Sequence, residues 1–254
     1  MNGNDIVIVS ATRTAIGKFG GQFATTSAIE LGTTVAKAAI QKANLSPEQI
    51  DTVIFGNVLQ AGLGQNPARQ VGLGAGLPHA STAVTINEVC GSGLKAIISA
   101  AQVLRLGDAK IVLAGGMENM SLASHLLQQR FAPKNGPVTL VDSLFNDGLT
   151  DAYSQDPMGI TAENIVEKYG FTREEQDAFA VASQQKAAKA QEEGRFDNEI
   201  TPVAVFNRKT KSDDLKATDE FIRPNTTLES LAGLKPAFKK DGTVTAGNAS
   251  GIND

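Results

Sequence analysis

The sequence predicts an α/β fold built on a largely parallel sheet with helices on its faces. Two observations predict it. Short runs of β-branched residues alternate with helical patterns over residues 6–116. Strands that are joined through helices run parallel, because each crossover returns the chain to the same end of the sheet. In addition, 41% of the 254 residues are hydrophobic and 20% are charged, which is typical of a globular chain.

The first two strands and the helix between them carry clear local signals. Residues 6–9, Ile-Val-Ile-Val, are the first expected strand. Ser27 is the N-cap of a capping box that begins a helix reaching about Ala43. Pro47 begins a short helical turn, and residues 52–55 are the second strand.

The next elements repeat this alternation. Asn66, followed by proline, begins a helix, and residues 83–89 are the third strand. A helix over residues 93–106 ends at a glycine, and residues 111–114 form the fourth strand. That helix is apolar nearly all round, so we expect it to be buried between two layers, which gives the fold more than two layers.

The texture of the sequence changes after the fourth strand. Charged residues become frequent and expected strands become scarce. Thr172 begins a long helix through a capping box, and this helix ends near Gly194. Residues 206–227 are polar and irregular. We therefore interpret residues 121–245 as a separate region inserted after the first sheet.

Composition excludes several classes of protein. The net charge of −4 argues against a nucleic-acid or membrane-surface protein, since both need a basic face. One Cys forms no internal disulfide, and one Cys with two His are too few for a zinc or iron–sulfur site. The N-terminus lacks a signal-peptide pattern, and polar residues interrupt each apolar stretch. We therefore expect a cytoplasmic protein without metal.

Cys90 is the candidate nucleophile. It follows an expected strand and precedes Gly-Ser-Gly and a helix, which is the strand–turn–helix order of a nucleophile elbow. Glycines permit the tight turn, and the N–H groups of a helix N-terminus favour a thiolate and can bind an oxyanion. The alternative is a small buried hydrophobe, since free Cys is among the most buried residue types.

Two further clusters offer polar backbone and small side chains. Residues 115–121 follow a strand, where ligands gather in parallel sheets, although a turn between domains also explains them. Residues 245–254 fit either a ligand-binding loop or a plain turn. His79 and His125 lie outside any motif and are expected on surface loops, so no histidine base accompanies Cys90.

Five blocks of sequence, taken together, carry a family resemblance. In order they cover residues 9–17, 56–69, 87–93, 115–121 and 245–254. They resemble the thiolases, and most closely the bacterial acetyl-CoA acetyltransferase branch, with this chain matching the N-terminal part only. The resemblance implies a layered α/β/α/β/α fold made of two similar halves, of which this chain holds the first.

The resemblance also implies a domain division and an assembly. Residues 1–120 would belong to the N-terminal α/β half, and residues 121–245 to a mostly helical loop domain that covers CoA. Residues 246–254 would return into the first half, where the sequence ends inside a motif, so we expect the natural protein to continue. Members of the family are usually homodimers or homotetramers.

The implied reaction is a reversible Claisen condensation of two acetyl-CoA to acetoacetyl-CoA and CoA, through an acyl thioester on Cys90. It needs no metal and no tightly bound cofactor, because the thioester supplies the activation. The residues implied to contact CoA are Leu149, Met158, Phe238, Ala246 and Ser250 along the pantetheine, and Arg223 and Ser230 at the adenosine end.

The chain departs from the family pattern at three places. Glu88 stands where the family commonly has lysine, and Pro157 where the branch commonly has a histidine near the pantetheine. The histidine of a Gly-His-Pro motif and a second cysteine have no counterpart in these residues. We therefore expect no appreciable turnover from this chain alone, and apolar surface left uncovered.

Alternatives remain open at this point. The chain is a truncated gene product, or one part of a split enzyme that needs a separate C-terminal half, or a non-catalytic thiolase-like scaffold that binds CoA. A β-ketoacyl synthase relative fits the residues around Cys90 less well, and a cysteine peptidase lacks its histidine motif.

Overall fold

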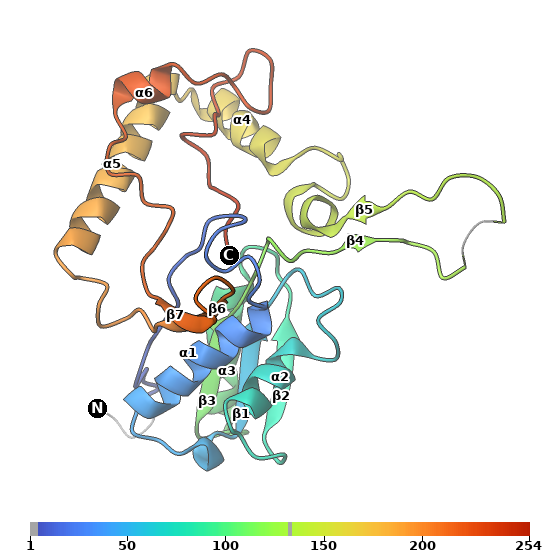
Figure 1. The fold of residues 1–254 in the computed structure, drawn as a ribbon, viewed down its shortest axis with the longest axis vertical. Coiled ribbons are helices and arrows are strands. Elements are labelled where there is room, and N and C mark those ends of the chain that lie inside the picture. Colours follow the sequence, from blue (N-terminus) through green and yellow to red (C-terminus); the bar gives the residue numbers. More distant parts are fainter. Residues whose placement is uncertain (1–4, 132–133) are drawn as a thin grey trace.

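A three-stranded parallel sheet organises the N-terminal half of the chain (Figure 1). The computed structural model describes residues 5–131 and 134–254. The strands are β1 (Thr52–Gly56), β2 (Thr82–Ile86) and β3 (Val112–Gly116), in the spatial order β2-β1-β3. Both pairings are parallel, which confirms the predicted sheet type.

Helices cover both faces of this sheet. The helices α1 (Ala28–Lys42) and α2 (Pro67–Gly74) pack on one face, and α3 (Ser92–Leu106) packs on the other. A short 3-10 turn, η1 (Pro47–Gln49), precedes β1, as the proline predicted. The result is an α/β/α arrangement in which α1 precedes β1, and α2 and α3 each connect two consecutive strands.

Alternation along β1 places its side chains on the two faces. Val53 and Phe55 are buried with α1 and α2, whereas Ile54 is buried against Ala96 and Ala100 of α3. Small residues at those two helix positions let α3 lie close to the sheet. The buried centre of the domain is therefore the middle strand, which is covered on both sides.

The predicted helix boundaries are confirmed, because local signals fix them. The Ser27 N–H donates to the Glu30 carboxylate at 2.7 Å, and the Ser27 hydroxyl accepts the Glu30 N–H at 3.2 Å. Asn66 caps α2 through its side chain. Gly107 ends α3 with φ at 79°, a left-handed conformation that glycine adopts without strain.

The first predicted strand is wrong. Residues 6–9 form no strand, and their four apolar side chains are 37–79% exposed. A strand needs a hydrogen-bonded neighbour, and the described chain places none beside this segment. The third predicted strand is also too long: β2 ends at Ile86, and Val89 has φ at 50°.

The outer face of α3 differs from its expected burial. Leu94 is 66% exposed and Ile98 is 44% exposed, because the described chain places a sheet on only one side of this helix. The window Val89–Leu106 is long and apolar enough to cross a membrane by length and composition alone, contrary to the expectation from the sequence. The face of α3 opposite Leu94 and Ile98 packs on β1, as expected for a helix in the core of a globular domain.

The second region extends from the sheet half as helices, two hairpins and loops. Figure 1 shows α4, α5 and α6 together at the top, with the β4–β5 arm projecting to one side. Its elements are β4 (His125–Leu126), β5 (Val141–Asp142), the π-helical turn η2 (Leu144–Leu149), α4 (Met158–Tyr169), α5 (Arg173–Glu192), β6 (Val203–Asn207), β7 (Ser212–Lys216) and α6 (Leu228–Ala232).

The hairpin of β6 and β7 includes residues that the sequence presented as polar and irregular: all of β7 and the end of β6 fall within residues 206–227. Val203 of β6 is 2% exposed and packs with Phe23 and with Leu31 of α1. The hairpin thus docks the second region onto the sheet half. Strand β7 has the sequence Ser-Asp-Asp-Leu-Lys. Asp and Lys are uncommon in strands, so the sequence did not predict this one.

A bidentate ion pair strengthens the same junction. Nη1 of Arg13 lies 2.8 Å from Oδ1 of Asp219, Nη2 lies 3.0 Å from Oδ2, and the Ile16 N–H donates to Oδ1 at 2.8 Å. The Asp219 side chain is only 7% exposed. Burial alone raises the pKa of Asp219, but the hydrogen bonds from Arg13 and Ile16 outweigh it and hold that pKa below its usual value.

Asp219→Asn is expected to lower the free energy of unfolding by roughly 2 kcal/mol at neutral pH, because a nearly buried bidentate partner is lost. The folded-state pKa of Asp219 is depressed, so its contribution is present above the unfolded pKa and is lost as the pH falls through the folded pKa. Urea unfolding across that acidic range is the measurement. The difference between wild type and variant should narrow in acid.

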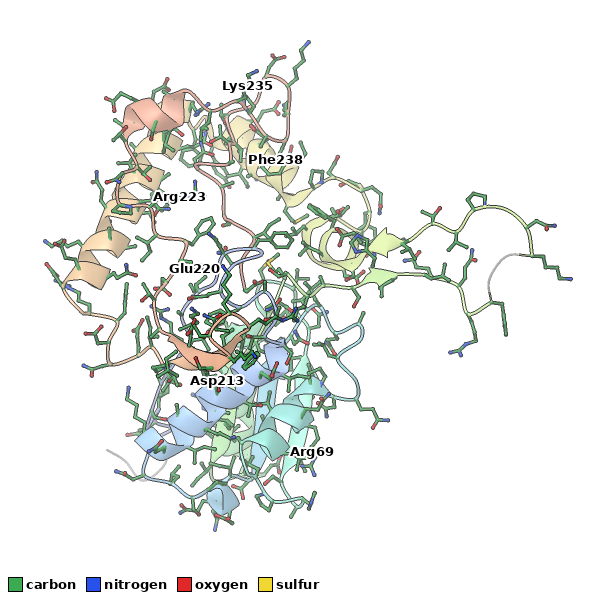
Figure 2. All side chains as sticks on the ribbon, in the orientation of Figure 1. Arg69, Asp213, Glu220, Arg223, Lys235 and Phe238 are labelled. Atoms are coloured by element: carbon green, nitrogen blue, oxygen red, sulfur yellow. The ribbon has the colours of Figure 1, made fainter. Side chains whose placement is uncertain are left out.

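The exposed Asp213 on β7 provides a matched control (Figure 2). Asp213→Asn is expected to unfold at the wild-type urea concentration. A wild-type-like Asp219→Asn variant at neutral pH would contradict the anchoring role assigned to the ion pair.

Candidate active site

Cys90 stands on a turn between β2 and α3, and it is exposed. This finding contradicts the alternative that Cys90 is a small buried hydrophobe. The preceding residue, Val89, has φ at 50°, which a β-branched side chain rarely adopts. A strained residue next to an exposed cysteine is the geometry expected of a nucleophile elbow.

Ser92 fixes this strained turn. Its hydroxyl accepts the Glu88 N–H at 2.9 Å and donates to the Val89 carbonyl at 2.6 Å. The Asn87 side chain accepts the Val89 N–H at 2.9 Å. Ser92 is 4% exposed, so its two hydrogen bonds are protected from water. The turn therefore depends on a buried hydroxyl that closes a loop over the residues before Cys90.

Two glycines let the first turn of α3 approach the strand ends. A Cβ added to Gly56, at the end of β1, would lie 2.7 Å from the Gly93 nitrogen. A Cβ added to Gly116, at the end of β3, would lie 3.3 Å from the Cα of Gly93. Larger residues there would push α3 away. The elbow thus sits directly at the carboxyl ends of the sheet, where parallel folds bind ligands.

Cys90 lines an open groove of about 1820 Å³. The groove extends past β3 to the exposed segment at residues 6–9, and its walls are mainly apolar. Of the residues that the resemblance implied for CoA, Leu149 on η2 lines this groove together with Cys90.

A half-buried carboxylate lies at the same end of the sheet. Glu118 follows β3 and accepts hydrogen bonds from the Val58 N–H at 2.9 Å and from Nδ2 of Asn57 at 2.8 Å. Burial raises the pKa of Glu118, against the opposing effect of the N–H donors of Val58 and Leu59. Both Glu118 and Asn57 line the groove.

Within the described part of the chain, the side chain of Asn57 lacks a hydrogen-bond partner at its oxygen. It is 1% exposed, and its Oδ1 is the one buried side-chain N or O atom that lacks a partner among the residues the structure describes. Asn57 and Glu118 lie inside the second and fourth blocks that carry the resemblance, and the sequence predicted no role for either. The available signal was their position, since each follows the end of a strand.

The segment of residues 245–254 meets the segment of residues 115–121 near Cys90. The Asp254 carboxylate accepts two hydrogen bonds from Ser121: Oδ1 accepts the backbone N–H at 2.8 Å, and Oδ2 accepts the hydroxyl at 2.5 Å. Asp254 also exchanges two backbone hydrogen bonds with Gly17. Three sequence blocks therefore converge, and Asn253 and Asp254 line the groove that holds Cys90.

The other residues implied for CoA lie in the second region. Figure 2 shows Phe238 and Arg223 near α4, α5 and α6, away from the sheet. Met158 begins α4, and Phe238 packs its ring against the neighbouring Gly159. Ser230 lies on α6, and its hydroxyl donates to Thr227. Ala246 and Ser250 are exposed on the return segment.

The two histidines lie apart from Cys90. His79 is exposed on the loop before β2, as expected. His125 is also exposed but belongs to strand β4, with Nε2 at 4.0 Å from the Asp142 carboxylate. Neither is among the described residues that line the groove. Within the described ranges, no group of three or more His, Cys, Asp or Glu could hold a metal ion.

Comparisons with known proteins agree with this geometry. The thiolase N-terminal domain family matches residues 6–254. An acetyl-CoA acetyltransferase of Cupriavidus necator is 57% identical over 98% of this chain and 64% of its own length. One from Thiocystis violacea is 58% identical over 98% of this chain and 63% of its own length.

A solved structure agrees as well. The crystal structure of the Bacillus anthracis acetyl-CoA acetyltransferase superposes with a TM-score of 0.93 at 42% identity, covering 98% of this chain and 62% of that chain. This chain therefore spans less than two thirds of the length of each of these proteins.

Ser92→Ala is expected to slow alkylation of Cys90 by iodoacetamide, because the turn loses the hydroxyl that holds it. The Glu88 N–H would lose its side-chain acceptor, and the Val89 carbonyl would keep only the Ser92 backbone N–H, at a cost of roughly 1 kcal/mol. Mass spectrometry of the alkylated protein over time measures the rate. Ser99→Ala, on the same helix, is the control and should react at the wild-type rate. Equal rates in both variants would show that Ser92 does not position the turn.

Proposed function

This chain belongs to the thiolase family, through that family's N-terminal domain, and we propose that it provides the nucleophile of an acetyl-CoA C-acetyltransferase. One observation carries the proposal. The single cysteine of the chain is exposed on a strained elbow at the carboxyl ends of a parallel sheet, and it faces a groove. The names of the relatives in C. necator and B. anthracis support the choice of reaction.

In the first half-reaction, the thiolate of Cys90 attacks the thioester carbonyl of acetyl-CoA. A new bond joins Sγ to the carbonyl carbon, the bond from that carbon to the CoA sulfur breaks, and CoA leaves as its thiol after taking a proton. Negative charge develops on the carbonyl oxygen in the transition state. We propose that N–H groups in the first turn of α3 stabilise this charge, since a helix leaves them without partners inside it, although that of Ser92 already donates to the Val89 carbonyl at 3.1 Å.

In the second half-reaction, the α-carbon of another acetyl-CoA loses a proton to a base. The resulting carbanion attacks the acetyl carbon on Cys90, and the bond from that carbon to Sγ breaks. The products are acetoacetyl-CoA and the free thiolate, and the reverse sequence cleaves acetoacetyl-CoA with CoA. The thioester makes the α-proton acidic enough for this chemistry, so the proposal includes no metal and no tightly bound cofactor.

The remaining parts of the proposal concern binding and assembly. The region over residues 121–245 covers CoA, with Leu149, Met158, Phe238, Ala246 and Ser250 along the pantetheine and Arg223 and Ser230 at the adenosine end. Acetyl-CoA, acetoacetyl-CoA and CoA are the proposed ligands. We further propose a cytoplasmic location and a homo-oligomer.

The proposal separates acylation from turnover. The 254 residues contain no second cysteine, and neither histidine is among the described residues that line the groove with Cys90. We propose that the proton transfers of the second half-reaction use groups from another polypeptide segment, such as a separate C-terminal half. The alternative function is a CoA-binding scaffold without chemistry, which the lack of a histidine beside Cys90 favours.

Incubation with acetyl-CoA is expected to add one acetyl group at Cys90, detected by mass spectrometry of the intact protein and its peptides. Cys90→Ala should take up none and serves as the matched control. Binding of CoA without any acetyl group on Cys90 would favour the scaffold over the acyltransferase. In parallel, CoA-dependent cleavage of acetoacetyl-CoA should be negligible with the chain alone and should appear when a folded C-terminal thiolase half is added.

A further inference from the structure

A buried polar relay joins α5 to the return segment. We define it as Arg173, Asp177 and Asn248. Asp177 is 4% exposed, and its two carboxylate oxygens have partners on opposite sides. Oδ2 accepts from Nε of Arg173 at 2.8 Å, and Oδ1 accepts from Nδ2 of Asn248 at 2.9 Å. The carboxylate is therefore the central link between two segments that lie far apart in the sequence.

The arginine end of the relay holds α6. Nη2 of Arg173 donates to the Leu231 carbonyl at 2.5 Å and to the Leu234 carbonyl at 3.1 Å. Carbonyls at the C-terminal end of a helix lack partners within the helix, so a charged donor there is stabilising. Arg173 thus fixes the end of α6, the helix that carries Ser230.

The asparagine end of the relay closes a turn. Oδ1 of Asn248 accepts the Thr245 N–H at 2.7 Å, and Nδ2 also donates to the Thr243 carbonyl at 3.1 Å. Thr245 is fully buried. A Cβ added to Gly247 would lie 2.5 Å from Cδ2 of Leu231 on α6, so the turn also packs tightly beside this helix. Ala246 lies inside this turn.

A second buried carboxylate holds the segment that leads into the turn. Glu163 of α4 is 4% exposed and accepts the N–H groups of Thr243 at 2.9 Å and Val244 at 2.8 Å. The turn is therefore tied to α4 through Glu163, to α5 through Asp177, and to α6 through packing. A segment with no regular structure of its own is fixed by carboxylates from two helices.

We propose that Asp177 is a positioning residue for CoA binding, an inference that rests on the proposed function. The relay sets the distance between Ser230 on α6 and Ala246 in the turn, which are assigned to the two ends of CoA. A ligand that binds at two places gains affinity from both only when their spacing matches its length. Asp177 itself touches neither the ligand nor Cys90 in this scheme.

The test measures CoA affinity and fragment affinity in the same variants. Asp177→Asn removes the carboxylate from Arg173 and places an amide opposite the amide of Asn248, so both links weaken. Asn248→Ala removes the link to the turn and leaves the pair of Arg173 and Asp177 intact. Titration calorimetry with CoA, and with adenosine 3′,5′-bisphosphate alone, gives the two affinities below the melting temperature of each variant.

Both variants are expected to bind CoA about tenfold more weakly than wild type, the loss that corresponds to about one hydrogen bond. Their affinity for adenosine 3′,5′-bisphosphate should not change, because the fragment occupies only one end. Alkylation of Cys90 by iodoacetamide should keep its wild-type rate. Glu174→Gln, an exposed residue on the same helix, is the matched control and should match wild type throughout.

The outcomes separate the inference from the function on which it rests. If wild type binds CoA and both variants match Glu174→Gln, the positioning role is wrong and the proposed function stands. If CoA and the fragment weaken equally, the relay has only a general structural role and the inference is also overturned. If wild type binds no CoA, the inference and the proposed binding of CoA fail together. Should Asp177→Asn not fold, Asn248→Ala decides the question.

Discussion

The close approach of the first turn of α3 to the ends of the strands is the constraint on which the candidate site depends. Gly56 and Gly116 permit that approach, because neither carries a Cβ that would meet Gly93. The short distance forces the chain through Val89 with positive φ, and the buried hydroxyl of Ser92 stabilises the result. Exposure of Cys90 is therefore a consequence of backbone packing, and the groove and the nearby carboxylate gain chemical meaning only because the sulfur is presented there.

The sequence predicted those parts of the fold whose causes are local. Ser27 and Thr172 begin α1 and α5 through capping boxes that involve residues only three positions apart, so the pattern sufficed. Residues 6–9 have strand composition, yet they form no strand, because a strand also needs a neighbour that no local pattern can supply. The same limit explains why the sequence did not predict the β6–β7 hairpin. Val203 of this hairpin packs against Phe23 and Leu31, and that contact between distant segments is visible only in the structure.

The candidate site was also predicted only where local patterns sufficed. The position of Cys90 between an expected strand and a Gly-Ser-Gly turn identified it as a candidate, and the resemblance of the chain to thiolases indicated a reaction. The sequence did not reveal that Asn57 and Asp177 are buried and that Glu118 is half-buried, because burial of a polar side chain depends on segments that approach it from elsewhere. Asn57 and Glu118 lie inside blocks that carry the resemblance and Asp177 does not, yet the contacts of all three become visible only in the structure.

The free edge of β3 has a consequence for how the protein behaves in concentrated solution. Within the described residues the sheet ends at β3, and the apolar segment at residues 6–9 lies across the groove from it. A strand edge offers regularly spaced donors and acceptors, and a neighbouring apolar segment adds adhesive area. Copies that meet through these features would form intermolecular ladders, so light scattering should rise steeply with protein concentration while the dilute protein stays dispersed.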